Sequence, residues 1–181
     1  MSKLYEVIDE RLAEFIRGQR VFFVATAPLS PGGHVNCSPK GGDCLRILGP
    51  REVAYLDYTG SGAETIAHIR ENGRIVVMFC AFEGSPKILR LHGHGEVLFS
   101  DSPRFRELAP QFPANPGQRA IVVVHADRIS TSCGLSVPCF DYAGEREGLN
   151  EWAAAKGAET LQSYRAKNNA LSIDGLPSLP R

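Results

Sequence analysis

The residues best suited to bind an anion lie in "YLDYTGSGAETIAHIRENGRIVVMF", residues 55–79. This stretch is typical of a strand, a glycine turn, a helix and a second strand, with the turn at residues 60–62. Backbone amides and the positive end of the helix dipole make such a turn suitable for a phosphate group. Hydroxyl groups of Thr59, Ser61 and Thr65 add possible donors. We therefore expect any bound phosphate to lie at this turn.

The same turn also has a purely structural interpretation. Ser61 and Glu64 form an S-x-x-E pattern, which predicts a capping box with Ser61 as the N-cap. The phosphate-binding motif GxxxxGK[ST] is absent, and Thr65 occupies the position of the third glycine of GxGxxG. Capping and phosphate binding are compatible, but the Glu64 carboxylate must turn away from a dianion.

Lys40 is the best candidate for a cation near that turn. It lies in "VNCSPKGG", residues 35–42, which predicts a strand from Val35 to Cys37 and then a turn. This geometry presents Ser38 and Lys40 at the end of the sheet. A solvent-exposed turn lysine is the alternative interpretation.

A strand with the sequence "KILRLHGHGEVLF", residues 87–99, carries two histidines. Its alternation places Arg90, His92, His94 and Glu96 on one face. Two histidines and a carboxylate are possible metal ligands, but one strand cannot complete a coordination sphere, so we expect no metal site. Gly93 and Gly95 favour a bent strand or a close approach of two backbones.

Composition limits the classes of protein to consider. The chain has 181 residues with 20 Lys and Arg against 20 Asp and Glu, so no basic field favours nucleic acid or an anionic membrane. No apolar run approaches the roughly 20 residues that span a bilayer, and the first residues lack a signal-peptide core. Five cysteines at scattered spacings predict no disulfide framework. We expect a cytoplasmic protein.

The elements around these residues predict a mainly β fold, a barrel with flanking helices. Apolar residues at helical spacing predict a helix over residues 4–17, and about seven strands follow with mostly short connections. Such connections favour an antiparallel sheet closed as a barrel. The tail from 147 to 170 predicts one or two helices around Gly157. We expect a barrel over residues 1–145 and a helical extension of the same domain over 146–181.

The order of these pieces resembles the pyridoxamine 5′-phosphate oxidase-like family of FMN-binding split barrels. The matching parts are "VNCSPKG", then "VAYLDYTGSGAETIAHIRENGRIVVMF", then "KILRLHGHGEV". The resemblance covers roughly residues 7–129 and implies a split barrel that forms a homodimer with FMN at the interface. It also implies a small-molecule substrate.

The resemblance assigns cofactor-binding roles residue by residue. Asn36 and Ser38 would run beside the flavin ring and ribityl chain, Lys40 would face the phosphate, and Arg90 would reach flavin or substrate across the interface. The full set of implied cofactor residues is Val35, Asn36, Ser38, Lys40, Asp57, Tyr58, Thr59, Gly60, Ser61, Gly62, Thr65 and Arg90. Cys133, Asp141 and Tyr142 are the candidates for lining the substrate pocket.

Several positions depart from true pyridoxamine 5′-phosphate oxidases. The Arg-Lys pair that grips the phosphate at the helix start corresponds to Glu64 and Thr65, and the Arg-Gln pair before the later strand corresponds to Lys87 and Ile88. The substrate-binding Arg-Leu-x-Pro ending has no counterpart in "SIDGLPSLPR". The resemblance therefore indicates a different branch of the family.

The expected function is an FMN-dependent oxidoreductase acting on an unidentified small molecule. The alternative is a flavin- or haem-binding protein without robust turnover, in which His92, His94 or His125 would ligate haem. The deazaflavin F420 remains an alternative to FMN, because related barrels bind either. A domain whose turn only caps a helix is the third class.

Overall fold

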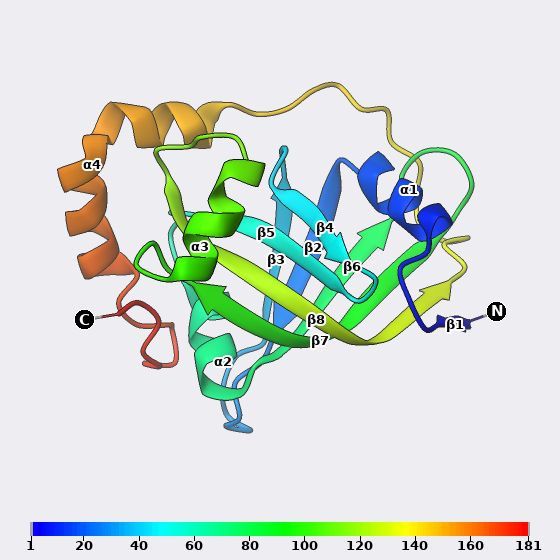
Figure 1. Ribbon diagram of the computed structural model, residues 1–181, viewed down its shortest axis with the longest axis horizontal. Coiled ribbons are helices and arrows are strands. Elements are labelled where there is room, and N and C mark those ends of the chain that lie inside the picture. The colour runs from blue at the N-terminus through cyan, green and yellow to red at the C-terminus, as the bar shows by residue number, and fades with distance from the viewer. Residues whose placement is uncertain (1, 181) are drawn as a thin grey trace.

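The computed structural model describes residues 2–180 and contains one curled antiparallel sheet with helices at its ends (Figure 1). The strands are β1 (Lys3–Tyr5), β2 (Val21–Thr26), β3 (Asn36–Gly41), β4 (Leu45–Gly49), β5 (Glu52–Tyr58), β6 (Arg74–Cys80), β7 (Ile88–Leu98) and β8 (Gln118–Ser132). Their order is β3-β2-β6-β7-β8-β5-β4, and β1 pairs with β8. Within the described residues no ladder joins β3 to β4, so the barrel is split along that line. The predicted mainly β split-barrel fold is confirmed.

The helices are α1 (Glu10–Gly18), α2 (Glu64–Asn72), α3 (Pro103–Leu108) and α4 (Gly148–Asn168), with a 3₁₀ turn η1 (Ala109–Gln111). In Figure 1, α1 and α4 lie at opposite ends of the sheet and α2 lies below it. The coil after β8 runs along the upper edge of the molecule from the α1 side to α4. Among residues 2–180, no helix combines the length and the apolar character needed to cross a membrane.

Alternation along each strand decides which side chains enter the core. On β2, Phe22 and Val24 are buried, whereas Val21 and Phe23 on the opposite face are only half-buried. Phe22 contacts the rings of Tyr55 and Phe79 at centroid distances of 5.8 Å each. Burial of these rings supplies much of the hydrophobic stabilisation of the barrel.

The prediction of one helix over residues 4–17 is wrong in its first half. Residues 3–5 pair with β8 as β1, with Lys3 opposite Thr131. Helix α1 begins only after Asp9, whose carboxylate accepts a hydrogen bond of 2.9 Å from the Leu12 amide. An N-cap side chain fixes where a helix begins, and the spacing of the apolar residues did not indicate that α1 begins after Asp9.

Strand β3 is longer than predicted and runs through Pro39 and Lys40 to Gly41. It is an edge strand, so the missing N–H of Pro39 removes no ladder bond on a second side. The chain reverses instead at Gly42, which has a φ of 76°. Lys40 is therefore a strand residue and not a turn residue.

The predicted capping box at α2 is also wrong. The helix begins at Glu64 with Ala63 as its N-cap, and no side chain caps it. Ser61 is exposed in the turn before it. The amides at the start of α2 are therefore left for other partners.

Of the two alternatives predicted for the β7 glycines, a close approach of two backbones is confirmed at Gly93, whereas Gly95 faces a side chain of α2. A Cβ atom on Gly93 would lie 1.9 Å from the His125 carbonyl oxygen, and one on Gly95 would lie 2.7 Å from Ile69 Cδ1. The register between β7 and β8 shifts at His92 and Gly93, which breaks the strict alternation that the sequence predicted.

Of the one or two helices predicted around Gly157, the two-helix alternative is favoured, because this residue has a φ of 73° and a ψ of 164° and interrupts α4. The kink folds the two halves of α4 toward each other, with the rings of Trp152 and Tyr164 at a centroid distance of 5.2 Å. Buried Ala153 and Leu161 anchor one half each.

Candidate functional site

Three polar side chains of β3 face the core side of the sheet at its split edge. Asn36, Ser38 and Lys40 alternate with the exposed Cys37 and Pro39, because successive strand residues point to opposite faces. Val35 lies just before β3 and is 74% exposed, apart from this group. The split edge of the barrel thus carries a polar lining.

A hydrogen-bond chain connects this lining to the start of α2. The Ser38 hydroxyl donates to Asn36 Oδ1 at 3.1 Å, and Asn36 Nδ2 donates to Thr65 Oγ1 at 2.9 Å. Asn36 Nδ2 also lies 3.4 Å from the buried Thr26 Oγ1. Side chains from β3 and α2 that the sequence assigned to the cofactor are therefore in direct contact.

Asp57, at the end of β5, is a buried carboxylate with two cationic partners. Arg119 Nε donates to Asp57 Oδ2 at 2.8 Å, and Lys40 Nζ lies 3.5 Å from Oδ1. The Asp57 and Arg119 side chains are 1% and 5% exposed. A buried charge requires such partners, since desolvation of an unpaired ion costs several kcal/mol, about 3–5 when one partner is removed.

The turn, residues 59–62, is bonded inward through its carbonyl groups. The Gly60 oxygen accepts from Asn169 Nδ2 at 3.1 Å, and the Gly62 oxygen accepts from Arg119 Nη1 at 2.9 Å. Within residues 2–180, no hydrogen bond uses the amides of residues 60–62 or the Ser61 hydroxyl. These groups remain available to a ligand.

Thr59 is fully buried and its hydroxyl is already used inside the protein. The hydroxyl donates to the Gly117 oxygen at 2.9 Å and accepts from Arg165 Nε at 2.7 Å. The neighbouring Tyr58 is half-buried, and burial raises the pKa of its phenol to about 12. The Tyr58 phenol is therefore neutral at pH 7. The Thr59 hydroxyl holds the turn to Gly117 and Arg165 and is not free to bind a ligand.

The Glu64 carboxylate folds back over the turn. A Cβ atom on Gly62 would lie 2.3 Å from Glu64 Oε2, so a larger residue at this position would require the Glu64 carboxylate to move. Gly60 has open space around its own Cβ position. A dianion at the turn requires Glu64 to rotate away, as the sequence indicated.

Arg165 and Asn169 of the C-terminal segment are site residues that sequence reasoning missed. Arg165 Nη2 donates to the Gln118 oxygen at 2.8 Å, and Asn169 Oδ1 accepts from Arg119 Nη1 at 2.8 Å. Asn169 is fully buried. Arg119 was missed as well, although Asp57, a carboxylate in an apolar strand, signalled the need for a buried cation. No signal in the sequence indicated Arg165 or Asn169.

The remaining predicted residues lie away from the turn. Arg90 sits on the face of β7 opposite the core and donates to Ser132 Oγ at 3.0 Å. Cys133 is exposed after β8, and the other four cysteines in the described part of the chain are also free thiols.

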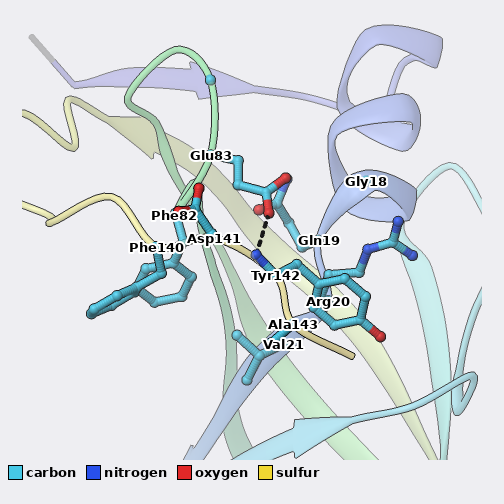
Figure 2. A pocket seen from close by; sticks show the side chains of 11 residues that line it. Gly18, Gln19, Arg20, Val21, Phe82, Glu83, Phe140, Asp141, Tyr142 and Ala143 are labelled. Atoms are coloured by element: carbon cyan, nitrogen blue, oxygen red, sulfur yellow. Dashed lines mark hydrogen bonds between the residues drawn. The ribbon is translucent and has the colours of Figure 1, made fainter. Parts of the chain in front are cut away.

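Asp141 and Tyr142 line a cavity of about 670 Å³ between α1, the 82–84 loop and the coil of residues 140–143. Figure 2 shows Phe82 and Phe140 side by side, at a centroid distance of 5.4 Å, and Tyr142 against Arg20. The Tyr142 amide donates to Glu83 Oε1 at 3.1 Å. This size suits a small organic molecule, and Cys133 does not line it.

Two of the three histidines considered as haem ligands lie beside acidic side chains, whereas His92 pairs with Arg128 on β8. His94 and His125 are opposite each other on β7 and β8, and both are exposed. His94 Nδ1 lies 3.7 Å from Asp127, and His125 Nδ1 lies 3.6 Å from Glu52. Within the described residues, no group of three or more potential ligands is arranged to hold a metal ion.

Two buried polar atoms flank the hydrogen-bond chain without partners among the described residues. They are the Tyr55 hydroxyl and His68 Nε2. His68 Nδ1 lies 2.9 Å from Thr26 Oγ1, and burial lowers the pKa of its imidazole, so the ring is neutral at pH 7. The polar core beneath the lining is thus uncharged apart from the Asp57 network.

The charges around the turn fit an anionic group. Lys40, Arg119 and Arg165 contribute three positive charges to a network that contains the Asp57 carboxylate, and Glu64 adds a second negative charge over Gly62. The network keeps a positive excess beside unused backbone amides. Such an arrangement can bind a phosphate through charge and directed N–H groups.

Comparison with known proteins points to one family. The family model described as pyridoxamine 5′-phosphate oxidase matches residues 8–133. The pyridoxamine 5′-phosphate oxidase family protein ustO of Aspergillus flavus is 37% identical over 196 residues, which cover 99% of this chain and 78% of that protein.

Two solved structures share the fold. HupZ of Group A Streptococcus has a TM-score of 0.52 at 22% identity, over 67% of this chain and 91% of that one. A pyridoxamine 5′-phosphate oxidase-related, FMN-binding protein of Nostoc punctiforme has a TM-score of 0.51 at 12% identity, over 72% and 86%. At these identities the likeness concerns the fold alone. The matched residues 8–133 end before α4, so Arg165 and Asn169 lie beyond them.

Proposed function

Because the chain belongs to the pyridoxamine 5′-phosphate oxidase family, we propose that it is an FMN-dependent oxidoreductase acting on a small molecule. The match over residues 8–133 and the relative with 37% identity establish the family. The cofactor and the reaction are our inference. FMN, when bound, supplies the hydride or electron transfer, so the protein needs no nucleophile of its own.

One observation carries the proposal: side chains from β3, β5 and α2 meet at the split edge, beside a turn with unused amides. The chain Ser38–Asn36–Thr65 and the pair Lys40–Asp57 bring together segments that the resemblance assigns to the cofactor. The turn amides and the positive charge would hold the phosphate, and the polar lining of β3 would contact the ring and ribityl chain. The cavity at Asp141 and Tyr142 would take the substrate.

We also propose a homodimer with the flavin at its interface. Support comes from the half-buried apolar face of the sheet opposite the core, formed by Val21, Phe23, Val76 and Met78. Apolar residues gathered on one sheet face suit an interface between two copies. The five free thiols support a reducing, cytoplasmic location.

The substrate should differ from pyridoxamine 5′-phosphate. The Arg-Leu-x-Pro ending with which the true oxidases hold their substrate has no counterpart in "SIDGLPSLPR", residues 172–181. We expect weak or no oxidation of pyridoxamine 5′-phosphate by the FMN-loaded protein.

The test is an absorption spectrum of the freshly purified protein, with mass spectrometry of the molecule that heat releases. FMN at about one copy per chain supports the proposal, and a deazaflavin or a Soret band would replace FMN with F420 or haem. Bleaching of the flavin by NADPH or NADH, and reoxidation by an acceptor, then separates an enzyme from a flavin-binding protein without turnover. A colourless protein that does not take up added FMN contradicts the proposal.

A further inference from the structure

We propose that Asn169 and Arg165 of the C-terminal segment, together with Arg119, are positioning residues that make the turn at residues 59–62 specific for a phosphate. Arg119 and Arg165 replace the cationic side chains missing at the start of α2, and Asn169 orients the turn by a hydrogen bond to the Gly60 oxygen. This inference rests on the proposed function, because it takes the terminal phosphate of FMN as the anion.

The geometry of the peptide groups is the first argument. In a trans peptide, the C=O and the following N–H point in opposite directions. Asn169 Nδ2 binds the Gly60 oxygen at 3.1 Å, and Arg119 Nη1 binds the Gly62 oxygen at 2.9 Å. Both carbonyls therefore point toward these side chains, and the amides of Ser61 and Ala63 point the opposite way, away from Asn169 and Arg119.

Charge behind these peptide groups is the second argument. The Arg119 guanidinium bonds directly to the Gly62 carbonyl, and hydrogen-bonded groups polarise one another in a poorly solvated site. The amide on the far side of that peptide becomes a stronger donor. Arg119 thus acts on the anion through the Gly62 peptide, without touching the anion. Arg165 bonds the Thr59 hydroxyl and the oxygens of Gly117 and Gln118, so it contributes its positive charge behind the turn.

Arg165 has no carboxylate partner within the described residues. Its partners are Thr59 Oγ1 at 2.7 Å and the oxygens of Gln118 and Gly117 at 2.8 and 3.4 Å. Burial, and then repulsion from Arg119, lower the pKa of the Arg165 guanidinium. A half-buried cation held only by neutral groups gains stability when an anion binds nearby.

The C-terminal segment is itself fixed in place. The Ser178 hydroxyl donates to the Asn169 oxygen, and Arg70 Nη1 of α2 donates to the Ser178 oxygen at 2.7 Å. Asn169 and Ser178 are fully buried. The segment therefore holds α2 and the turn together. The segment itself lies outside residues 8–133, which the family model matches.

The test compares FMN with riboflavin, which lacks the phosphate. The dissociation constants of both are measured by quenching of flavin fluorescence for the wild type, Asn169→Leu and Arg165→Gln. The ratio of riboflavin to FMN dissociation constants reports the phosphate contribution alone. We expect each variant to lower this ratio about tenfold, the scale of a weakened hydrogen bond to a charged group.

Two further variants separate charge from structure. Lys167→Gln removes one positive charge from an exposed position of the same helix and should leave the ratio unchanged. Arg165→Lys keeps the charge and should largely restore the ratio. If the variants weaken FMN and riboflavin equally, or leave FMN unaffected, the inference is overturned and the segment is only structural.

Failure of the proposed function gives a different result. If the wild type binds neither FMN nor riboflavin, that proposal fails, and inorganic phosphate then probes the turn through thermal unfolding. Phosphate stabilisation of the wild type but not of Asn169→Leu supports the inference in that case. Equal stabilisation, or none, overturns it.

Discussion

At the scale of single residues, the pair formed by Asp57 and Arg119 is the most consequential contact. We expect Arg119→Met to lower the free energy of unfolding by about 3–5 kcal/mol, because it leaves a buried carboxylate with only Lys40 at 3.5 Å. Chemical denaturation measures this loss. The double variant Asp57→Leu with Arg119→Met should be more stable than Arg119→Met alone, since no buried anion remains. A loss below about 1 kcal/mol for Arg119→Met would contradict this account.

His68 gives a prediction for pH dependence. Burial lowers the pKa of its imidazole in the folded protein, against opposing effects of Asp174, Glu71 and Glu64. The unfolded chain binds a proton near pH 6.5 and the folded chain does not, so stability falls as the pH drops below about 6.5.

The His68 contribution to this slope is at most about 1.4 kcal/mol per pH unit, for one proton. His68→Gln should flatten the decline of the unfolding free energy between pH 7 and 5. His94→Gln, at an exposed position, controls for the loss of an imidazole. An unchanged slope in His68→Gln would show that other groups govern acid stability.

The sequence predicted residue types better than residue partners. Lys40 and Asp57 both belonged to the predicted site, but their contact across the split edge was not foreseen. Arg165 and Asn169 were missed because they lie 106 and 109 residues from Thr59 and Gly60, and no local pattern reports such pairings. The sequence therefore predicted the part of the site formed by the turn and β3. It did not predict the part formed by the C-terminal segment.

At the scale of elements, the close pairing of β7 and β8 depends on Gly93, which has no side chain. We expect Gly93→Ala to destabilise the protein by about 1–3 kcal/mol or more, because the new Cβ would meet the His125 carbonyl oxygen at 1.9 Å. Thermal unfolding measures the effect. Gly18→Ala, where a Cβ meets nothing within 4 Å, is the matched control and should be neutral or slightly stabilising. Equal stability of the two variants would mean that the strands can separate without penalty.

Element types followed from periodicity, whereas element ends did not. The strands β5, β6 and β8 and the kink at Gly157 could be predicted because apolar alternation and a lone glycine are local signals. The starts of α1 and α2 could not, because the apolar spacing continued across the Asp9 N-cap and the Ser61–Glu64 pattern indicated a cap two residues before Ala63. Pairing of residues 3–5 with β8 outweighed their helical spacing.

At the scale of the whole molecule, the proposed dimer can be tested at Phe23. This half-buried ring lies on the sheet face opposite the core, with Met78 as its neighbour on β6. We expect the wild type to have the mass of a dimer in light scattering and Phe23→Glu to have that of a monomer, because a charge in an apolar interface is unfavourable. Val7→Glu, on an exposed apolar residue elsewhere, should remain a dimer. A monomeric wild type would remove the homodimer from the proposal.

The link between the turn and the C-terminal segment also sets an order of events during protein synthesis. Gly60 leaves the ribosome 109 residues before Asn169, its hydrogen-bond partner. At roughly 5–20 residues per second, the turn waits on the order of 5–20 s for the groups that orient its amides. The nascent barrel can pair its strands in that interval. Its full affinity for a phosphate should arise only when α4 and Asn169 have been synthesised. We therefore expect ribosome-bound chains that end before α4 to bind FMN more weakly than the 181-residue chain, and tight cofactor binding to be a late step in the maturation of this protein.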